Sequence, residues 1–289
     1  MPPYPFSKLN VFKTKSALGE YLAPFRKSGK RIGFVPTMGA LHAGHISLIQ
    51  AAKKENDLVV CSIFVNPTQF NDPEDLKKYP RPVEKDLALL EEHHCDVVFM
   101  PEVEEMYADN APWTHDFGLL ERVFEGKFRA GHFRGVGQIV KMLFESVEPH
   151  HAYFGQKDFQ QFLVIKKLVS DFHMPVELTA CPIVREANGL AMSSRNVHLS
   201  LEERSNAGQI FRILSQTREN LYLFPVAELE KTAMEQLALI PGASPEYFNI
   251  VNNTDLSAVT NPETEAVCVA LVAVRIGKTR LIDNMILKP

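Results

Sequence analysis

"GFVPTMGALHAGHISLIQAAKK", residues 33–54, joins an apolar run to a stretch of helical period through a short loop of small residues. The apolar run predicts a strand that ends at Thr37, and the later residues predict a helix that begins near Ala43. Two histidines, His42 and His45, lie at the junction. A buried strand followed directly by a helix is the repeating unit of a parallel sheet, so this stretch indicates an α/β fold.

The same alternation continues to about residue 186. Further strands are predicted by "LVVCSIFV", "CDVVFMP", "HAYFG" and "PVELTACPIV", and helices by the residues from Val83 to His94 and by "DFQQFLVIKKLVSDF". The pattern then changes to two helices, "LEERSNAGQIFRILSQTREN" and "VAELEKTAMEQLALI", followed by three strands, the last two joined at "IGKT". We therefore predict a Rossmann-like parallel sheet in an N-terminal domain, residues 1–186, and a smaller α+β C-terminal domain, residues 187–289.

Composition and charge narrow the possible partners and location. The chain has 289 residues, of which 45% are hydrophobic, and a formal net charge of -4. Without a basic excess, binding to nucleic acid or to an anionic membrane is not expected. Four widely spaced cysteines predict reduced thiols rather than disulfides or a zinc site. The N-terminus lacks a signal pattern, and no run reaches the roughly 18 apolar residues of a membrane span. We expect a cytoplasmic protein.

The junction around the two histidines has the chemistry of an anion site. The first turn of a helix presents unpaired backbone N–H groups and the positive end of the helix dipole. Gly39 and Gly44 have no Cβ, so a nucleotide could approach the backbone closely, and His42 and His45 can donate hydrogen bonds to phosphate oxygens. Two alternatives are a pair of ordinary loop or helix-cap histidines, and a metal pair. The metal pair lacks a third histidine or cysteine nearby.

Three further loops follow predicted strands and carry side chains able to bind phosphates or oxygen-rich substrates. Each also has a plain structural alternative, such as a solvent-facing amide, a surface lysine, an N-cap aspartate or a flexible Ser-Ser-Arg loop. Because the carboxyl ends of parallel strands share one edge of a sheet, four such loops together favour a binding site. The side chains are Gln69 in "FVNPTQF", Lys157, Asp158 and Gln161 in "FGQKDFQQF", and Ser193, Ser194 and Arg195 in "PIVREANGLAMSSRN".

An ordered set of motifs resembles the pantothenate synthetases, or pantoate beta-alanine ligases, of the nucleotidyltransferase superfamily marked by an H-x-G-H signature. The motifs are "PTMGALHAGH", "FVNPTQF", "YPR" at residues 79–81, "YFGQKDFQQ" and "GLAMSSRN", and they span nearly the whole predicted N-terminal domain. The resemblance implies that ATP activates pantoate as pantoyl adenylate with release of pyrophosphate. The amine of beta-alanine then displaces AMP to give pantothenate. It also implies Mg²⁺, and we expect a homodimer. Because the loop of Ser193, Ser194 and Arg195 lies where the strand-helix alternation ends, we further hypothesise that the C-terminal domain is a lid that shields the adenylate from water.

The resemblance further implies roles for single residues. His45 corresponds to the catalytic proton donor and His42 to its phosphate-binding companion, while Gln69 and Gln161 correspond to the glutamines that hold pantoate. Asp86 stands where the family has an acid near magnesium, with Lys85 beside it where some members have another acid. Two of the implied ATP contacts, Lys157 and Arg195, also offset the phosphate charge in catalysis. The implied ATP contacts are Met38, Gly39, Ala40, Leu41, His42, Ala43, Gly44, His45, Gly155, Gln156, Lys157, Asp158, Val184, Met192, Ser193, Ser194 and Arg195.

Two other functions stay open on the sequence alone. One is a related nucleotidyltransferase that acts on a phosphorylated small molecule, and the paired amides, in place of an arginine or lysine cluster, argue against it. The other is a non-catalytic nucleotide-binding module, because a fold does not by itself imply an activity. The intact histidines, Lys157 and Arg195 argue against that module.

Overall fold

The computed structural model describes residues 9–108 and 113–288, which divide into two compact units. The first unit contains the described residues up to Gly155 together with Val164–Cys181. The second contains Gln156–Leu163 and the described residues from Pro182 onward. The predicted domain boundary at residue 186 lies five residues beyond Cys181, and it assigns residues 156–163 to the N-terminal domain instead.

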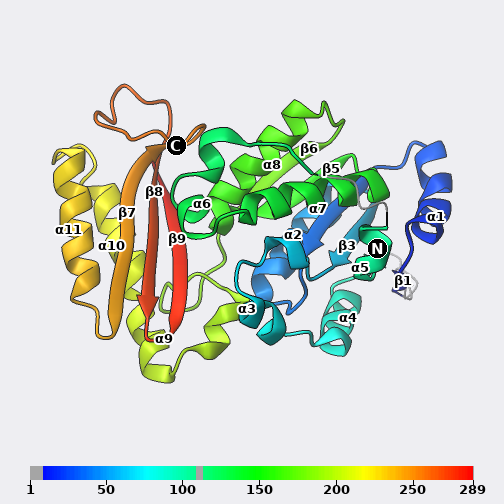
Figure 1. The fold of residues 1–289 in the computed structure, drawn as a ribbon, viewed down its shortest axis with the longest axis horizontal. Helices are drawn as coiled ribbons and strands as arrows, with labels where there is room; N and C mark the ends of the chain where they lie inside the picture. Colours follow the sequence, from blue (N-terminus) through cyan, green and yellow to red (C-terminus); the bar gives the residue numbers. More distant parts are fainter. Residues whose placement is uncertain (1–8, 109–112, 289) are drawn as a thin grey trace, which may run out of the picture. The chain divides into compact units, whose positions relative to one another are not determined.

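A six-stranded parallel sheet organises the first unit, in the order β1-β4-β3-β2-β5-β6 (Figure 1). β2 pairs in parallel with β3 on one side and with β5 on the other, so the strand order reverses next to β2. In α/β folds such a switch point is where ligands bind, at the carboxyl ends of the strands. The strands are β1 (Asn10–Phe12), β2 (Ile32–Thr37), β3 (Leu58–Ile63), β4 (Val97–Phe99), β5 (His151–Gly155) and β6 (Glu177–Cys181).

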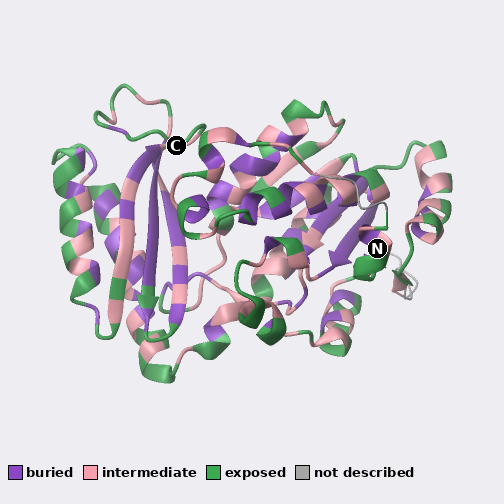
Figure 2. Cartoon of the chain, viewed as in Figure 1, coloured by how far each residue is buried: buried purple, intermediate pink, exposed green. Residues whose placement is uncertain are grey.

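The central strands are predominantly apolar and buried, as expected of a parallel sheet that is covered on both faces. All six residues of β3 are buried, which Figure 2 shows as continuous purple along the strand. On β2, Val35 packs with Leu48 and Ile49 of helix α2 (Ala43–Glu55), whereas the ring of Phe34 meets Phe144 of helix α7 (His132–Val147) edge-on at 6.2 Å. The alternation of side chains along one strand thus supplies both cores.

Of the helices before residue 200, five were not predicted from the sequence: α1, α3, α5, α6 and α7. Helices α2, α4 and α8 begin and end close to the predictions, and α4 covers most of the residues predicted from Val83 to His94. The helices are α1 (Lys15–Lys27), α2 (Ala43–Glu55), α3 (Pro73–Lys78), α4 (Val83–Glu92), α5 (Val103–Met106), α6 (Glu125–Phe128), α7 (His132–Val147) and α8 (Phe159–Asp171), with 3-10 turns η1 (Pro67–Gln69), η2 (Gly118–Glu121), η3 (Gln156–Asp158) and η4 (Ser194–His198).

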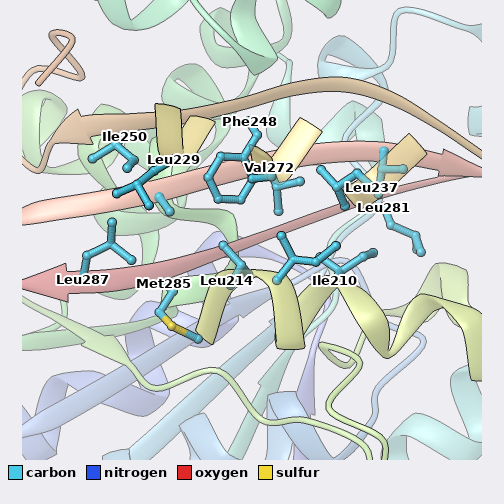
Figure 3. Close-up of a cluster of buried hydrophobic side chains, with 14 of the residues drawn as sticks. Ile210, Leu214, Leu229, Leu237, Phe248, Ile250, Val272, Leu281, Met285 and Leu287 are labelled. Atoms are coloured by element: carbon cyan, nitrogen blue, oxygen red, sulfur yellow. The ribbon is translucent and has the colours of Figure 1, made fainter. Parts of the chain in front are cut away.

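The second unit is an antiparallel sheet, β7-β8-β9, that packs against α10 and α11. Leu229 and Leu237 of α11 meet Phe248 and Val272 of the strands in one apolar cluster (Figure 3). Burial of side chains of this size contributes about 1.5–3 kcal/mol each. The elements are α9 (Leu201–Ala207), α10 (Gln209–Glu219), α11 (Val226–Ala238), β7 (Ala243–Asn252), β8 (Cys268–Ile276) and β9 (Thr279–Lys288).

One predicted element of this unit differs from the structure. "LEERSNAGQIFRILSQTREN" was expected to form one helix, but it forms two, α9 and α10, which meet at Gly208. Near this junction the Asn188 Nδ2 donates to the carbonyl of Arg204 at 2.8 Å. That carbonyl therefore has a partner outside the helix at the point where the helical hydrogen-bond ladder is interrupted, although Gly208 itself keeps helical dihedral angles.

The cysteines agree with the prediction of reduced thiols. Cys61, Cys95, Cys181 and Cys268 are all free and buried. Burial raises the pKa of the Cys95 thiol to about 12, so this side chain behaves as a small apolar group. Over residues 9–108 and 113–288, no helix combines the length and apolar content needed to cross a membrane.

Candidate active site

Two imidazole side chains cap the N-terminus of α2. His42 is the N-cap residue, and its Nδ1 accepts a hydrogen bond from the backbone N–H of Gly44 at 3.1 Å. His45 completes a reciprocal capping box, because its Nδ1 accepts from the backbone N–H of His42 at 3.3 Å. The ring centroids are 4.2 Å apart. The alternative of helix-cap histidines is therefore realised.

Capping also fixes which nitrogen of each ring carries the proton. A ring nitrogen that accepts a hydrogen bond has no proton, so in the neutral imidazole the proton lies on Nε2. The hydrogen bonds thus assign both histidines as Nε2–H donors at the positive end of a 13-residue helix. Side-chain donors beside a helix N-terminus are suited to a phosphate.

The loop between β2 and α2 is held by the carboxylate of Asp86, which lies on α4. Asp86 is 1% exposed, and its two oxygens accept the backbone N–H groups of Ala40 and Leu41, each at 2.8 Å. Gly39 has φ of 78°, and a Cβ at that position would lie 2.9 Å from Asp86 Oδ2. Burial raises the pKa of Asp86, and the two backbone donors oppose this shift. The loop conformation therefore depends on a residue outside the loop motif.

Gln69 is fixed at both ends of its amide. It is 7% exposed, its Oε1 accepts from Asn66 Nδ2 at 3.2 Å, and its Nε2 donates to Met38 Sδ at 3.0 Å. Asn66 is itself buried, and its Oδ1 accepts from the Tyr107 hydroxyl at 2.5 Å. The amide predicted to hold pantoate thus lies beside Met38, the first residue of the predicted ATP loop.

Helix α7 supports this turn through backbone contact. A Cβ on Gly135 would lie 2.6 Å from the Thr68 carbonyl oxygen, so only glycine allows the helix to come this close. The Asn66 Nδ2 also donates to the carbonyl of Gly135 at 3.1 Å. His132, which is 4% exposed, places Nδ1 2.9 Å from the carbonyl oxygen of Gln69. The first turn of α7 therefore fixes the position of Gln69.

In the second unit, the turn η3 carries the predicted ATP contacts Gln156, Lys157 and Asp158. The Lys157 Nζ lies 3.6 Å from Asp158 Oδ1, and the lysine side chain is only 18% exposed. The Gln156 Nε2 donates to Asn284 Oδ1 at 3.1 Å. Asn284 Nδ2 in turn donates to the carbonyls of Gln156 and Lys157, each at 2.9 Å. Strand β9 therefore binds this turn through three hydrogen bonds.

The segment that contains Val184 and Met192 is also fixed from β9. Arg185 binds Asp283 through two hydrogen bonds, of 2.6 and 3.0 Å, and stacks on Phe211 with its Cζ 4.2 Å from the ring centroid. The same guanidinium donates to the Gly189 carbonyl at 3.0 Å. The Met192 backbone N–H donates to the Val184 carbonyl at 3.0 Å, which closes the segment into a narrow loop.

Ser193 begins the turn that carries Ser194 and Arg195. Its hydroxyl accepts the backbone N–H of Arg195 at 3.3 Å. The next residue, Asn196, is 4% exposed and donates to Glu186 Oε1 at 2.9 Å. The pKa of Glu186 is lowered chiefly by its hydrogen bonds from Arg204, at 2.6 and 2.9 Å. The predicted phosphate-binding loop is thus attached to α9 through a charged pair.

Comparison with known proteins identifies the family. The family model of pantoate-beta-alanine ligase matches residues 10–286, which is almost the whole chain. The chain belongs to the pantoate-beta-alanine ligase family. The family resemblance of the sequence motifs, the fold class and the ligase activity are thereby confirmed.

Close relatives of this pantoate-beta-alanine ligase match over their full length. A pantothenate synthetase of Porphyromonas gingivalis is 48% identical over 277 residues, which cover 96% of this chain and 99% of the relative. The crystal structure of pantothenate synthetase from Thermus thermophilus is 42% identical, with a TM-score of 0.90, and the match covers 97% of this chain and all of that one. A pantoate-beta-alanine ligase from Francisella tularensis, complexed with beta-gamma ATP and beta-alanine, is 36% identical, with a TM-score of 0.80 over 97% and 98% of the two chains.

The predicted site residues of this ligase fall into both units. In the first unit the structure brings Met38 next to Gln69, places His42 and His45 in one capping box, and joins Asp86 to residues 40 and 41. Gly155 ends β5 in this unit. The second unit contains Gln156, Lys157, Asp158, the half-buried Gln161, Val184 and Met192 to Arg195.

Sequence reasoning missed the residues that position these groups. The sequence analysis did not single out Asn66, although an asparagine before proline at the end of a buried strand is a signal for a side chain that binds nearby backbone. No local signal pointed to His132, Arg185, Asp283 or Asn284. Their partners lie 63 to 128 residues away in the chain.

The geometry of Asp86 does not fit the predicted role of a magnesium ligand. Both carboxylate oxygens already accept backbone N–H groups, and the side chain is almost fully buried. Over the described residues, no group of three or more histidine, cysteine, aspartate or glutamate side chains could hold a metal ion. Mg²⁺ is commonly bound through substrate phosphates and water, with few protein ligands. Asp86 is better explained as an anchor of the loop.

Proposed function

We propose that this protein joins pantoate to beta-alanine at the expense of ATP, with pantoyl adenylate as the intermediate. The observation that carries this proposal is the adjacency of two kinds of donor in the first unit. Imidazole donors and a helix N-terminus suit phosphates, and the neutral Gln69 amide beside Met38 suits a hydroxy acid. The ATP and beta-alanine in the complex of the Francisella relative support the same substrates here.

In the first step, a carboxylate oxygen of pantoate attacks the α-phosphorus of ATP. A new P–O bond forms, the bond to the β-phosphate oxygen breaks, and pyrophosphate leaves. His42 and His45 donate from Nε2 to phosphate oxygens, and Lys157 and Arg195 offset the negative charge. Gln69 and Gln161 orient pantoate without neutralising its carboxylate, so the nucleophile keeps its charge.

In the second step, the amine of beta-alanine attacks the acyl carbon of the adenylate. A C–N bond forms, the C–O bond to AMP breaks, and the amine loses a proton. No side chain of the protein becomes covalently attached in either step. The protein therefore contributes mainly by positioning its substrates and by preorganised hydrogen-bond donors.

Mg²⁺ is part of this proposal as a companion of the ATP phosphates, which it would bind and partly neutralise. The buried Asp86 is not assigned to it. We also expect a homodimer, which light scattering of the purified protein would test. The cytoplasmic location stays a prediction.

Product analysis tests the proposed reaction. With ATP, pantoate and beta-alanine, the protein should release AMP and pyrophosphate in equal amounts with pantothenate. Release of ADP and phosphate would instead mean an acyl-phosphate intermediate and would contradict the proposal. If only a phosphorylated small molecule is adenylylated, the protein is the related nucleotidyltransferase.

The predicted lid function of the C-terminal domain can be tested in the intact protein. A lid would exclude water from an adenylate that water otherwise hydrolyses. With ATP and pantoate but no beta-alanine, the protein should form about one adenylate per site and then release little free AMP. Continuous AMP release at the rate of the full reaction would contradict shielding.

A further inference from the structure

Strand β9 buries two adjacent polar residues, Asp283 and Asn284, in an otherwise apolar region. They are 6% and 2% exposed, while their neighbours Leu281 and Met285 belong to the apolar core of the second unit. Burying a carboxylate and an amide is unfavourable unless each finds partners. Both residues find those partners in segments predicted to contact ATP.

Asn284 binds the backbone of the turn that carries Lys157. Its amide nitrogen donates to the carbonyls of Gln156 and Lys157, and its amide oxygen accepts from the Gln156 side chain. Two backbone carbonyls require a donor, so these contacts also determine which end of the amide faces the turn. The conformation of Gln156 and Lys157 is therefore set by a residue 127 to 128 positions later in the chain.

Asp283 binds the second ATP-contacting segment through Arg185. The Arg185 guanidinium donates to the Asp283 carboxylate twice, to the Gly189 carbonyl and, at 3.4 Å, to the Asn284 carbonyl. This pairing fixes the loop between Val184 and Met192, and it therefore also fixes the position of Ser193, the next residue in the chain. One dipeptide on β9 thus connects both predicted ATP segments of the second unit.

We propose that Asp283 and Asn284 are positioning residues for the adenylation step, with Asn284 acting through Lys157. This inference rests on the proposed function, since it needs Lys157 to contact the phosphates of ATP. If Asp283 and Asn284 only stabilised the fold, apolar side chains of similar volume could take their place, because such replacements of buried polar groups often leave the stability unchanged. Two fixed backbone carbonyls on a turn, in contrast, set the direction in which the lysine leaves the chain.

A double-mutant cycle on Lys157 and Asn284 tests this proposal. Single-turnover formation of pantoyl adenylate is measured for the wild type, Lys157→Ala, Asn284→Ala and the double variant. We expect Asn284→Ala to be slower by on the order of tenfold, because a misplacement of about 1 Å can cost up to roughly 10²-fold. In the Lys157→Ala background, the same change should cost less than about twofold, because the residue it positions is gone.

A control variant in the same unit is Thr217→Val on α10. The Thr217 hydroxyl is buried and donates to the Ile213 carbonyl at 3.0 Å, remote in sequence from both ATP segments. It should leave the rate of adenylate formation within about twofold of the wild type even if the melting temperature falls. Melting of every variant is followed by circular dichroism.

The outcomes separate the inference from the proposed function. Near wild-type activity of Lys157→Ala would remove the lysine from the mechanism and overturn the inference, whereas the proposed reaction fails only if product analysis does not give AMP and pyrophosphate. A slow Lys157→Ala with an unaffected Asn284→Ala, or equal losses from Asn284→Ala in both backgrounds, would overturn the inference alone. If Asn284→Ala does not fold, Asn284→Ser keeps a small polar side chain at this position but removes the amide that binds both carbonyls. It should slow adenylation a few-fold with Lys157 present and change the Lys157→Ala rate by less than about twofold.

Discussion

The two regions of this protein that are predicted to contact ATP are held in place in different ways. In the first unit, the capping box of α2 is made by His42 and His45 within the motif itself, and one carboxylate, Asp86, fixes the preceding loop. In the second unit, Lys157 and the loop before Ser193 depend on β9, at the far end of the chain. The first region is therefore held by its own histidines together with one carboxylate from α4, whereas the motifs of the second region contain none of the β9 side chains that hold them.

The largest expected effect tests whether the first region acts by chemistry or by capping. His45→Ala should slow pantoyl adenylate formation by roughly 10²- to 10³-fold, the usual effect of removing one preorganised donor. His42→Asn should slow it comparably while the helix stays capped, since asparagine is a good N-cap residue. Single-turnover kinetics and thermal melting separate the two effects. A melting temperature that falls while adenylation stays near wild type would reduce the histidines to structural caps.

A second effect concerns the neutral amide of Gln69, the predicted pantoate contact in the first unit. Gln69→Glu should lower kcat/KM for pantoate by roughly 10²-fold, because a carboxylate cannot donate and repels the carboxylate of the substrate. ATP affinity, measured by titration without pantoate, should hardly change. An equal loss for both ligands would mean that Gln69 supports the loop at Met38 rather than binding pantoate.

A smaller effect is expected at the anchor of the first loop. In Asp86→Asn, an amide N–H₂ would face one of the two backbone N–H groups, so one donor loses its acceptor. The KM for ATP should rise roughly tenfold at saturating Mg²⁺. Glu84→Gln, an exposed change on the same helix, serves as the control. A higher Mg²⁺ requirement with an unchanged KM for ATP would restore Asp86 as a metal ligand.

The smallest effect tests the charged pair that supports the second region. The pKa of Glu186 is lowered by Arg204, so the pair stabilises the folded state above the usual glutamate pKa of 4.5 and loses that contribution as the pH falls below it. Glu186→Gln should cost about 1 kcal/mol or less at pH 7, since Arg204 is half exposed, and less still at pH 4. Denaturation at both pH values, with Glu202→Gln as control, measures the difference. A larger loss at pH 4 than at pH 7 would contradict this pairing.

The sequence predicted the parallel sheet well because its strands are continuous apolar runs between clear helices. β2, β3 and β5 lie where the runs placed them, and α2 begins at Ala43 as expected. Helix α7 was not predicted, although ten of its residues are buried, because Gly135 and Gly137 interrupt the usual helical signal. The break at Gly208 depends on Asn188, a partner outside the helix that periodicity cannot reveal.

The candidate site was predictable only as far as its motifs. Side chains at one strand-to-helix junction lie within one short stretch of sequence, so the motifs themselves point to His42, His45 and Lys157. Asn284 and Asp283 have no such neighbours, and a buried Asp-Asn pair in a strand is unusual only once its burial is known. The role of Gln156 likewise becomes visible only through its contact with Asn284.

The late position of Asn284 has a consequence for synthesis on the ribosome. Gln156 emerges 128 residues before the side chain that binds it. At translation rates of about 5–20 residues per second, the turn at Lys157 waits roughly 6–25 seconds for its partner. During that time the sheet of the first unit can fold while the second unit is still missing its last strand. We expect a nascent chain to acquire its complete nucleotide site only after β9 has emerged, so premature termination before β9 should leave a folded sheet without an active enzyme.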